Sequence, residues 1–229
     1  MSFEESACSV ELKLNNFTKY VRRQNIARFL VQSELFRMQL NVKGSIVECG
    51  VHHGGGLMAW AKLSSTLEPY NYHRKVIGFD TFEGFPSVSD ADTKRHPDVK
   101  KGMFSVDYDV LDEIQNCIQE YDNNRYLGEI KKIQLVRGDA NETIPQFVRD
   151  NPHFLVSLLF LDFDIMEPTT TALENFLPRM PKGAVIAFDE LNNVDWPGET
   201  IAFLESMDIR KSALKCFEFE PNISYIVLD

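Results

Sequence analysis

Acidic side chains follow two neighbouring strand-like segments of this chain. Asp162 comes after the apolar run 155–161, and the pair Asp189 and Glu190 comes after a second apolar run, 184–188. A helical pattern that begins at a proline separates the runs, as in a β-α-β unit, so both strands should end at the same edge of a parallel sheet. Like charges at one edge repel unless a cation or a proton lies between them. We therefore predict that Asp162, Asp189 and Glu190 bind a divalent metal ion.

Three further acids lie at the ends of the first three predicted strands. Glu48 lies near the end of the first strand, Asp80 directly follows the second, and Asp139 comes shortly after the third. A carboxylate at the position of Asp80 can accept hydrogen bonds from two ribose hydroxyls. Asp139 is well placed for an adenine amino group. Each acid alone is equally well explained as a helix cap or a surface residue, but together they predict a cofactor pocket.

A glycine-rich turn follows the first strand, and glycine lets a backbone turn tightly and approach a ligand. The dinucleotide pattern GxGxxG does not start at Gly50, because the residue two positions later is His52. A looser version starting at Gly54 falls late, near the following helix. The P-loop pattern fails because no Lys follows the turn. The sequence of the turn alone does not decide whether it binds a ligand. The adjacent His52 and His53 have no third ligand at zinc spacing, so a ligand-contact role for either histidine also stays open.

The order of the predicted elements defines the fold class. Alternating strands and helices indicate an α/β protein with a doubly wound parallel sheet. A short turn at Pro221 and Asn222 predicts a terminal hairpin, so the last strand should run antiparallel. The predicted helices are residues 17–40, 57–67, 106–121, 142–149, 169–177 and 199–206, and the predicted strands are 45–49, 75–79, 133–136, 155–161, 184–188, 214–219 and 224–228.

The chain of 229 residues is expected to form one domain. We predict an N-terminal arm at 1–16 and a single domain at 17–229. Residues 81–105 have no regular period and contain glycines and prolines, which is typical of a lid loop. His96 in this loop is better explained as a solvated side chain than as a base or a substrate contact.

Composition excludes several classes of function. The formal net charge of −10 argues against binding to nucleic acid or to an anionic membrane surface. No apolar run approaches the roughly 18 residues of a membrane span, and the acidic N-terminus does not resemble a signal peptide. The four cysteines lack metal-binding spacing, and Cys49 and Cys216 fall in apolar strand patterns that predict buried, reduced thiols. A cytoplasmic location is therefore expected.

Five segments resemble the macrocin O-methyltransferase family, whose members are S-adenosylmethionine-dependent and metal-dependent sugar methyltransferases. They are GVHHGGG at 50–56, FDTFEGFP at 79–86, GDANETIP at 138–145, LDFDIMEPTTTALENFLPRM at 161–180 and AFDELN at 187–192. The resemblance covers roughly residues 17–229, and the second and fourth segments are its most specific parts. It implies a class I methyltransferase-like Rossmann sheet of about seven strands, with an antiparallel last strand and helices on both faces.

The resemblance also implies roles for particular residues. It assigns six to the S-adenosylmethionine site: Glu48, Gly50, His53, Gly54, Asp80 and Asp139. Glu48, Gly50 and Gly54 would line the methionine end. Mg²⁺ or another divalent cation would be held by Asp162, Asp189 and Glu190. The chain departs from the family at Glu190, where aspartate is usual, at His52 and His53, and at Met166, where an aromatic residue is common.

The expected function is Mg²⁺-dependent O-methylation of a hydroxyl on a sugar or a glycosylated small molecule, by a homodimer or a larger homo-oligomer. Asp162 is the candidate general base as well as a metal ligand. Asp164 is assigned a structural role, and Trp196 fits a core residue and an acceptor wall equally well. A catechol-like acceptor is the alternative, disfavoured by the polar sequence at 87–102. A non-catalytic scaffold that binds S-adenosylmethionine is also considered because of Glu190, and a nicotinamide oxidoreductase is disfavoured by the glycine spacing.

Overall fold

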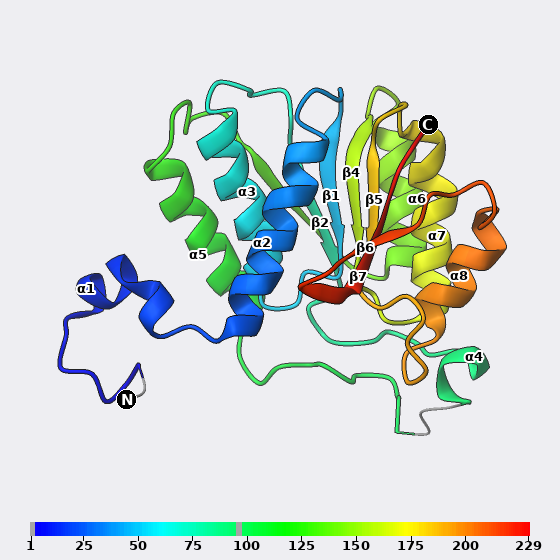
Figure 1. Ribbon diagram of the computed structural model, residues 1–229, viewed down its shortest axis with the longest axis horizontal. Helices are drawn as coiled ribbons and strands as arrows, with labels where there is room; N and C mark the ends of the chain where they lie inside the picture. The colour runs from blue at the N-terminus through cyan, green and yellow to red at the C-terminus, as the bar shows by residue number, and fades with distance from the viewer. Residues whose placement is uncertain (1–2, 95–97) are drawn as a thin grey trace.

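The computed structural model describes residues 3–94 and 98–229, which form a seven-stranded sheet with helices on both faces (Figure 1). The strand order is β3-β2-β1-β4-β5-β7-β6. Strands β1 to β5 pair in parallel, whereas β7 is antiparallel to both of its neighbours. The strands are β1 (Ser45–Cys49), β2 (Val76–Asp80), β3 (Ile133–Arg137), β4 (Val156–Leu161), β5 (Val185–Phe188), β6 (Lys215–Phe217) and β7 (Glu220–Val227). The predicted parallel sheet with an antiparallel last strand is confirmed.

The helices form two layers around this sheet. Helices α2, α3 and α5 cover one face, and α6, α7 and α8 cover the other (Figure 1). The helices are α1 (Val10–Asn15), α2 (Arg23–Met38), α3 (Gly55–Leu67), α4 (Asp90–Thr93), α5 (Val110–Asn123), α6 (Ala140–Asp150), α7 (Met166–Phe176) and α8 (Gly198–Ser206), with short 3₁₀ segments η1 (Phe17–Lys19) and η2 (Leu177–Arg179).

Strand alternation divides the core between the two layers. In β1, Ile46 belongs to the core under α2 and α3, whereas Val47 belongs to the core under α6 and α7. The central strand β4 is buried along its whole length, which explains why its sequence reads as a continuous apolar run. Both faces of this strand are covered by helices, so alternation with polar residues is not needed.

The N-terminal region differs from its prediction. The helix expected at 17–40 is divided into η1 and α2, and α1 forms inside the expected arm. In α2 the buried face contains Val31 and Leu35, whereas the apolar residues Phe29 and Leu30 are 43% and 47% exposed. Apolar residues surround much of this helix, so their spacing did not select a single face.

The C-terminal hairpin also differs in detail. Its turn lies at residues 218–219, and Pro221 and Asn222 belong to β7 instead of the turn. The pairing partners of β6 move from Glu220 to Ser224 across one step of the strand, so the proline falls in an irregularity that needs no ladder hydrogen bond. Cys216 is exposed on this edge strand, contrary to the prediction, whereas Cys49 is buried as expected.

The carboxyl ends of β1 to β5 all face the lower end of the molecule in Figure 1, where the segment containing α4 crosses beneath the sheet. In open parallel sheets this edge is where ligands bind. Within the described ranges, no helix is both long and apolar enough to cross a membrane.

Candidate active site

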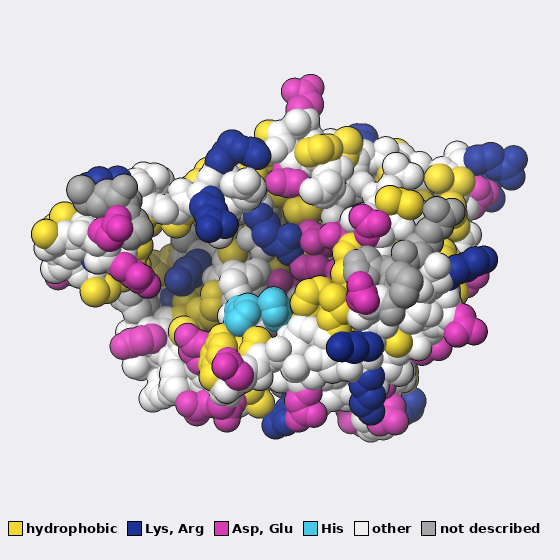
Figure 2. Space-filling model, turned by 90° about the horizontal axis from the view of Figure 1, so that it is seen from below, with side chains coloured by type: hydrophobic (Ala, Val, Ile, Leu, Met, Phe, Trp, Pro, Cys, Tyr) yellow, Lys and Arg dark blue, Asp and Glu magenta, His cyan; other side chains and the backbone are white. Residues whose placement is uncertain are grey.

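A cleft opens at the carboxyl ends of the parallel strands. Its volume is about 910 Å³, counting the part that is open to solvent. Figure 2 looks onto this end of the molecule and shows histidine, acidic and basic side chains gathered near the middle of the face. The lining includes four of the predicted site residues: Gly50, Asp80, Asp139 and Asp162.

Gly50 allows the turn after β1 to pack directly against the end of β4. Its φ of +90° is unfavourable for other residues, and a Cβ atom there would lie 1.9 Å from the Asp162 carbonyl oxygen. The Asp162 N–H in turn donates to the Cys49 carbonyl at 2.8 Å. The glycine therefore brings the turn after β1 and Asp162, the first predicted metal ligand, together.

Asp80 organises the loops on either side of the cleft. Its Oδ2 accepts hydrogen bonds from the backbone N–H groups of Val51 at 2.7 Å and His52 at 2.8 Å, and its Oδ1 accepts from Phe82 N–H at 2.7 Å. A carboxylate offers about four acceptor positions. These bonds leave room for about one further donor, so Asp80 holds the glycine turn in place besides facing the cleft.

Asp139 is the N-cap of α6. Its Oδ1 accepts a hydrogen bond from Asn141 N–H at 2.9 Å, and the residue lines the cleft next to Ala140. Asp139 can cap the helix with one carboxylate oxygen and still face a ligand in the cleft with the other.

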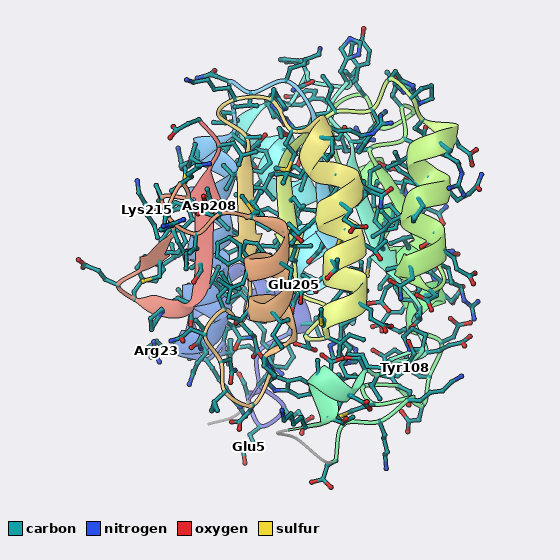
Figure 3. All side chains as sticks on the ribbon, turned by 90° about the vertical axis from the view of Figure 1, so that its right-hand side faces the viewer. Glu5, Arg23, Tyr108, Glu205, Asp208 and Lys215 are labelled. Atoms are coloured by element: carbon teal, nitrogen blue, oxygen red, sulfur yellow. The ribbon has the colours of Figure 1, made fainter. Side chains whose placement is uncertain are left out.

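Three other predicted cofactor residues do not line the cleft. Glu48 is buried behind the turn, against Gly56, where an added Cβ would lie 1.9 Å from the Glu48 Oε1. Gly54 is buried with φ +80° and caps α3. The His53 Nδ1 lies 2.6 Å from the hydroxyl of Tyr108, which lies at the same end of the molecule as α4 (Figure 3). His52 lines the cleft in place of His53.

Glu48 is an unusual acid. Its Oε2 has no hydrogen-bond partner among the described residues. Burial raises the pKa of Glu48 to about 8, although the Arg28 charge opposes this shift. At neutral pH the side chain is therefore largely protonated.

The carboxylates at the ends of β4 and β5 are joined by an arginine that the sequence analysis missed. Arg28 of α2 donates from Nη1 to Asp189 Oδ1 and from Nη2 to Asp162 Oδ2, both at 2.6 Å. Its guanidinium carbon lies 5.5 Å from the centre of the Phe160 ring. Burial lowers the pKa of Arg28, but Asp189 and Asp162 outweigh it and raise the pKa overall. Asp162 and Asp189, two of the three predicted metal ligands, therefore converge on one positively charged guanidinium.

The third predicted ligand, Glu190, faces different partners. Asn193 Nδ2 donates to its Oε2 at 3.2 Å, and its backbone N–H donates to Glu199 Oε2 at 3.2 Å. Glu199 is fully buried, and its Oε1 has no hydrogen-bond partner in the described parts of the chain. Burial, followed by the charge of Asp162, raises the pKa of Glu199 well above its ordinary value. Glu199 was also missed by the sequence analysis.

Asp164 lines the cleft just beyond the end of β4. It adopts φ +63°, which is uncommon for a residue with a side chain. Burial, and then the charges of Glu190 and Asp189, raise the pKa of Asp164 to about 7.

These carboxylates suit a hard divalent cation in their chemistry, because Mg²⁺ prefers oxygen ligands. Their present arrangement differs from a formed metal site: among residues 3–94 and 98–229, no group of three His, Cys, Asp or Glu side chains is placed to hold a metal ion. The space between Asp162 and Asp189 contains the Arg28 guanidinium instead. The donor set fits a cation provided that this side chain moves.

Aromatic rings form one side of the cleft mouth. Phe104 lies 5.3 Å from Phe85, 5.8 Å from Trp196 and 6.1 Å from His52, measured between ring centres. Trp196 comes from the β5–α8 connection and is half-buried, so it joins two loops at this wall. Six residues of 81–105 line the cleft, and three of them, Phe82, Phe85 and Phe104, are aromatic. None of the six lies within 87–102, so the polarity of that stretch does not describe this wall.

The segment 81–105 is anchored beside this wall. Ser89 and Asp92 form a capping box at the start of α4, and Asp92 Oδ1 also accepts a hydrogen bond from the Met166 N–H at 3.0 Å. Asp92 is only 3% exposed. His96, considered above as a substrate contact, lies outside the described residues.

A sequence signal for Arg28 does exist. Arg28 precedes Gln32 by one helical turn, and Gln32 is buried between the apolar residues of α2. Two polar residues one turn apart on the sheet-facing side of a helix indicate that a polar group of the sheet lies against them. The sequence does not identify that partner, because it belongs to strands more than 130 positions away.

The fold and the site define the class of protein. An open sheet with this strand order, a glycine turn after β1 and acids after β2 and β3 is the class I methyltransferase fold. Residues 23–209 match the family described as macrocin O-methyltransferase (TylF). The chain belongs to the macrocin O-methyltransferase family.

Individual relatives agree with this assignment. The 8-demethyl-8-(2,3-dimethoxy-alpha-L-rhamnosyl)-tetracenomycin-C 4'-O-methyltransferase of Streptomyces olivaceus is 27% identical over 156 residues, which cover 65% of this chain and 53% of that protein. The chain thus spans about half the length of this relative. The crystal structure of CalS11, a calicheamicin methyltransferase, is 34% identical with a TM-score of 0.93, covering 98% of this chain and 87% of that one. An apo structure of CalS11, described as a TDP-rhamnose 3'-O-methyltransferase, is 31% identical with a TM-score of 0.84, covering 98% and 88%.

Proposed function

We propose that this protein transfers a methyl group from S-adenosylmethionine to a hydroxyl of a sugar or a glycosylated small molecule, with Mg²⁺ or another divalent cation. The observation that carries the proposal is the cleft at the carboxyl ends of β1 to β4, with Gly50, Asp80, Asp139 and Asp162 on its walls. Membership of the macrocin O-methyltransferase family supports the same reaction.

The cofactor would lie over the glycine turn. Gly50 leaves the backbone bare where the methionine end would pass, and Asp80 would accept from a ribose hydroxyl with its remaining capacity. Asp139 would meet the adenine at the end of β3. Glu48 would support the glycine turn and would not contact the cofactor directly, because it is buried and does not line the cleft.

The acceptor would enter beside the aromatic wall. The faces of Phe85, Phe104 and Trp196 suit the apolar face of a sugar ring. Two of the similar proteins are described by reactions on rhamnose-bearing compounds, which favours a deoxysugar as the acceptor.

Methyl transfer needs an acceptor oxygen that loses its proton. A divalent cation, when bound by Asp162, Asp189 and Glu190, would lower the pKa of the acceptor hydroxyl. Asp162 lies on the cleft wall and would take the proton. The aromatic wall and the loops held by Asp80 would orient the acceptor and exclude water.

A catechol-like acceptor is the second candidate. The aromatic lining from Phe82, Phe85 and Phe104 favours it, because flat aromatic acceptors bind between apolar side chains.

Both candidates are tested by one acceptor screen. The full chain is incubated with S-adenosylmethionine and either TDP-rhamnose or a catechol, in Mg²⁺ and in EDTA, and the products are analysed by mass spectrometry. We expect one added methyl group on the sugar nucleotide, in Mg²⁺ only. Methylation of the catechol alone would replace the first candidate with the second, and equal activity in EDTA would contradict the role of the cation.

A further inference from the structure

We propose that Arg28 is a built-in competitor for the divalent cation: its guanidinium occupies the cation position and must leave before a metal ion binds, so Arg28 sets the metal affinity of the site. This inference deepens the proposed function and rests on its metal site. It concerns a residue on α2, outside the strands and loops that form the cofactor cleft.

The contacts of Arg28 and of a metal ion exclude each other. Each terminal nitrogen of Arg28 lies 2.6 Å from one carboxylate oxygen, one on Asp162 and one on Asp189. Such charge-assisted hydrogen bonds are the strong ones in proteins. A Mg²⁺ ion shared by the same oxygens would sit about 2.1 Å from each. The guanidinium would then stand in its way, and two positive charges in one place repel.

Arg28 is free to move while its helix stays fixed. The neighbours Ala27, Val31 and Leu35 are buried and hold α2 against the sheet. The Arg28 side chain is 40% exposed, whereas those of Asp162 and Asp189 are 23% and 16% exposed. Helix α2 begins at Arg23, at the end of the molecule where the strands terminate (Figure 3). Rotation of one side chain toward solvent therefore clears the site.

The charge balance around Arg28 favours a second occupant with a higher charge. The Arg28 guanidinium pairs with both Asp162 and Asp189, so one positive charge faces two carboxyl groups. Beside them, Glu48 and Glu199 are almost fully buried, and each has one oxygen without a hydrogen-bond partner in the described residues. Buried polar atoms are normally paired. A divalent ion would supply twice the positive charge of Arg28 to these acids.

The test is a Mn²⁺ titration of the full chain, followed by electron paramagnetic resonance of the free ion, for wild type, Arg28→Met and Arg28→Lys. Methionine keeps much of the side-chain volume and removes the charge, and lysine keeps the charge but cannot bridge two carboxylates with a planar fork. We expect Arg28→Met to bind Mn²⁺ at least about tenfold more tightly than wild type, with Arg28→Lys between them. Arg37→Met, at an exposed arginine of the same helix, is the matched control and should bind like wild type.

A thermal melt of the same proteins gives a second readout. Without metal, Arg28→Met leaves Asp162 and Asp189 unbalanced, so its Tm should be lower than that of wild type in EDTA and should rise more steeply with added Mn²⁺. This comparison also establishes that the variant is folded.

The outcomes separate the two proposals. Equal Mn²⁺ affinity of wild type and Arg28→Met, or loss of binding in a folded Arg28→Met, would overturn the competitor role and leave the metal site standing. Absence of Mn²⁺ binding in every variant would overturn the metal site and the competitor role together. Methyl transfer from S-adenosylmethionine would still be tested by the acceptor screen.

Discussion

Asp162 contacts several parts of the predicted site. It lines the cleft, pairs with Arg28, and lies against the glycine turn through its backbone. Burial and the nearby Asp189 raise the pKa of Asp162 well above its ordinary value, while Arg28 opposes this shift. A carboxylate in this environment holds a proton more readily than an exposed one, which suits a general base.

Replacing Asp162 with Asn should remove the base and one cation ligand while keeping the shape of the side chain. We expect kcat to fall by about 100-fold or more, since general bases contribute at least that much. Binding of S-adenosylhomocysteine should change by less than about threefold. Steady-state kinetics and calorimetry measure the two quantities, and an Asp162→Asn enzyme with nearly full kcat would refute the catalytic assignment.

Glu48 makes a separate prediction about pH. Its pKa is raised to about 8 in the folded protein from 4.5, because burial disfavours its charged form. The folded state therefore binds a proton that the unfolded state releases, and stability is fully present below about pH 4.5 and is lost as the pH rises through about 8. The loss is on the order of a few kcal/mol.

Glu48→Gln carries a permanently neutral group at this position. Its free energy of unfolding, measured by urea denaturation from pH 5 to 8.5, should fall less with pH than that of wild type. If both proteins lose the same stability over this range, burial does not hold Glu48 in its protonated form.

The position of an acid at the carboxyl edge of the sheet can be predicted from the sequence where the acid ends a strand. Asp80, Asp139, Asp162 and Asp189 follow apolar runs, and strand ends of a parallel sheet meet at one edge. Arg28 and Glu199 were missed because their roles depend on which helix packs over that edge. Short-range spacing does not contain that information.

At the scale of elements, the turn after β1 depends on a glycine that no other residue can replace. Gly50 has φ +90° and would place a Cβ 1.9 Å from the backbone oxygen of Asp162, the residue after β4. We expect Gly50→Ala to lower the free energy of unfolding by at least about 2 kcal/mol and to weaken cofactor binding.

Gly55 provides the matched control in the same turn. It begins α3, and a Cβ there meets nothing within 4 Å. Gly55→Ala should be neutral or stabilise by up to about 1 kcal/mol, because alanine favours helix. Chemical denaturation of both variants measures the contrast, and similar losses in the two would show that the turn does not depend on the close approach at Gly50.

The elements themselves were largely predictable, and their boundaries were less so. The segments that form β1, β4 and β5 are short, apolar and bounded by turn residues. Both their assignment as strands and their positions therefore agree with the prediction from the sequence. The N-terminal helix predicted at 17–40 was wrong in its start, because residues 17–19 form η1 and α2 begins at Arg23. The hairpin turn was displaced by three residues, since a register shift in β6 accommodates Pro221.

At the scale of the whole molecule, the N-terminal region carries exposed apolar side chains. Helix α1 lies apart from the body of the protein (Figure 1), and Val10, Leu12 and Leu14 on it are 63%, 54% and 61% exposed. Phe29 and Leu30 on α2 are also exposed. We propose that a second copy of this chain covers these residues, as expected for a homodimer or a larger homo-oligomer.

Leu12→Lys combined with Leu14→Lys places charges on this surface without touching the cleft. Light scattering after gel filtration should give a multiple of the 26.3 kDa chain mass for wild type and a lower multiple for the double variant. A wild-type protein that elutes as a monomer at micromolar concentration would contradict the proposed assembly.

The central claim is that the cleft at the carboxyl edge binds S-adenosylmethionine. Calorimetric titration of the full chain with S-adenosylhomocysteine, for wild type and Asp80→Ala, tests it most directly. Asp80 accepts two backbone hydrogen bonds from the glycine turn and one from the loop that follows β2. We expect micromolar binding to wild type and at least about tenfold weaker binding to a folded Asp80→Ala. No binding to wild type, with or without Mg²⁺, would contradict the proposed cofactor site and favour a scaffold that has kept the fold without the chemistry.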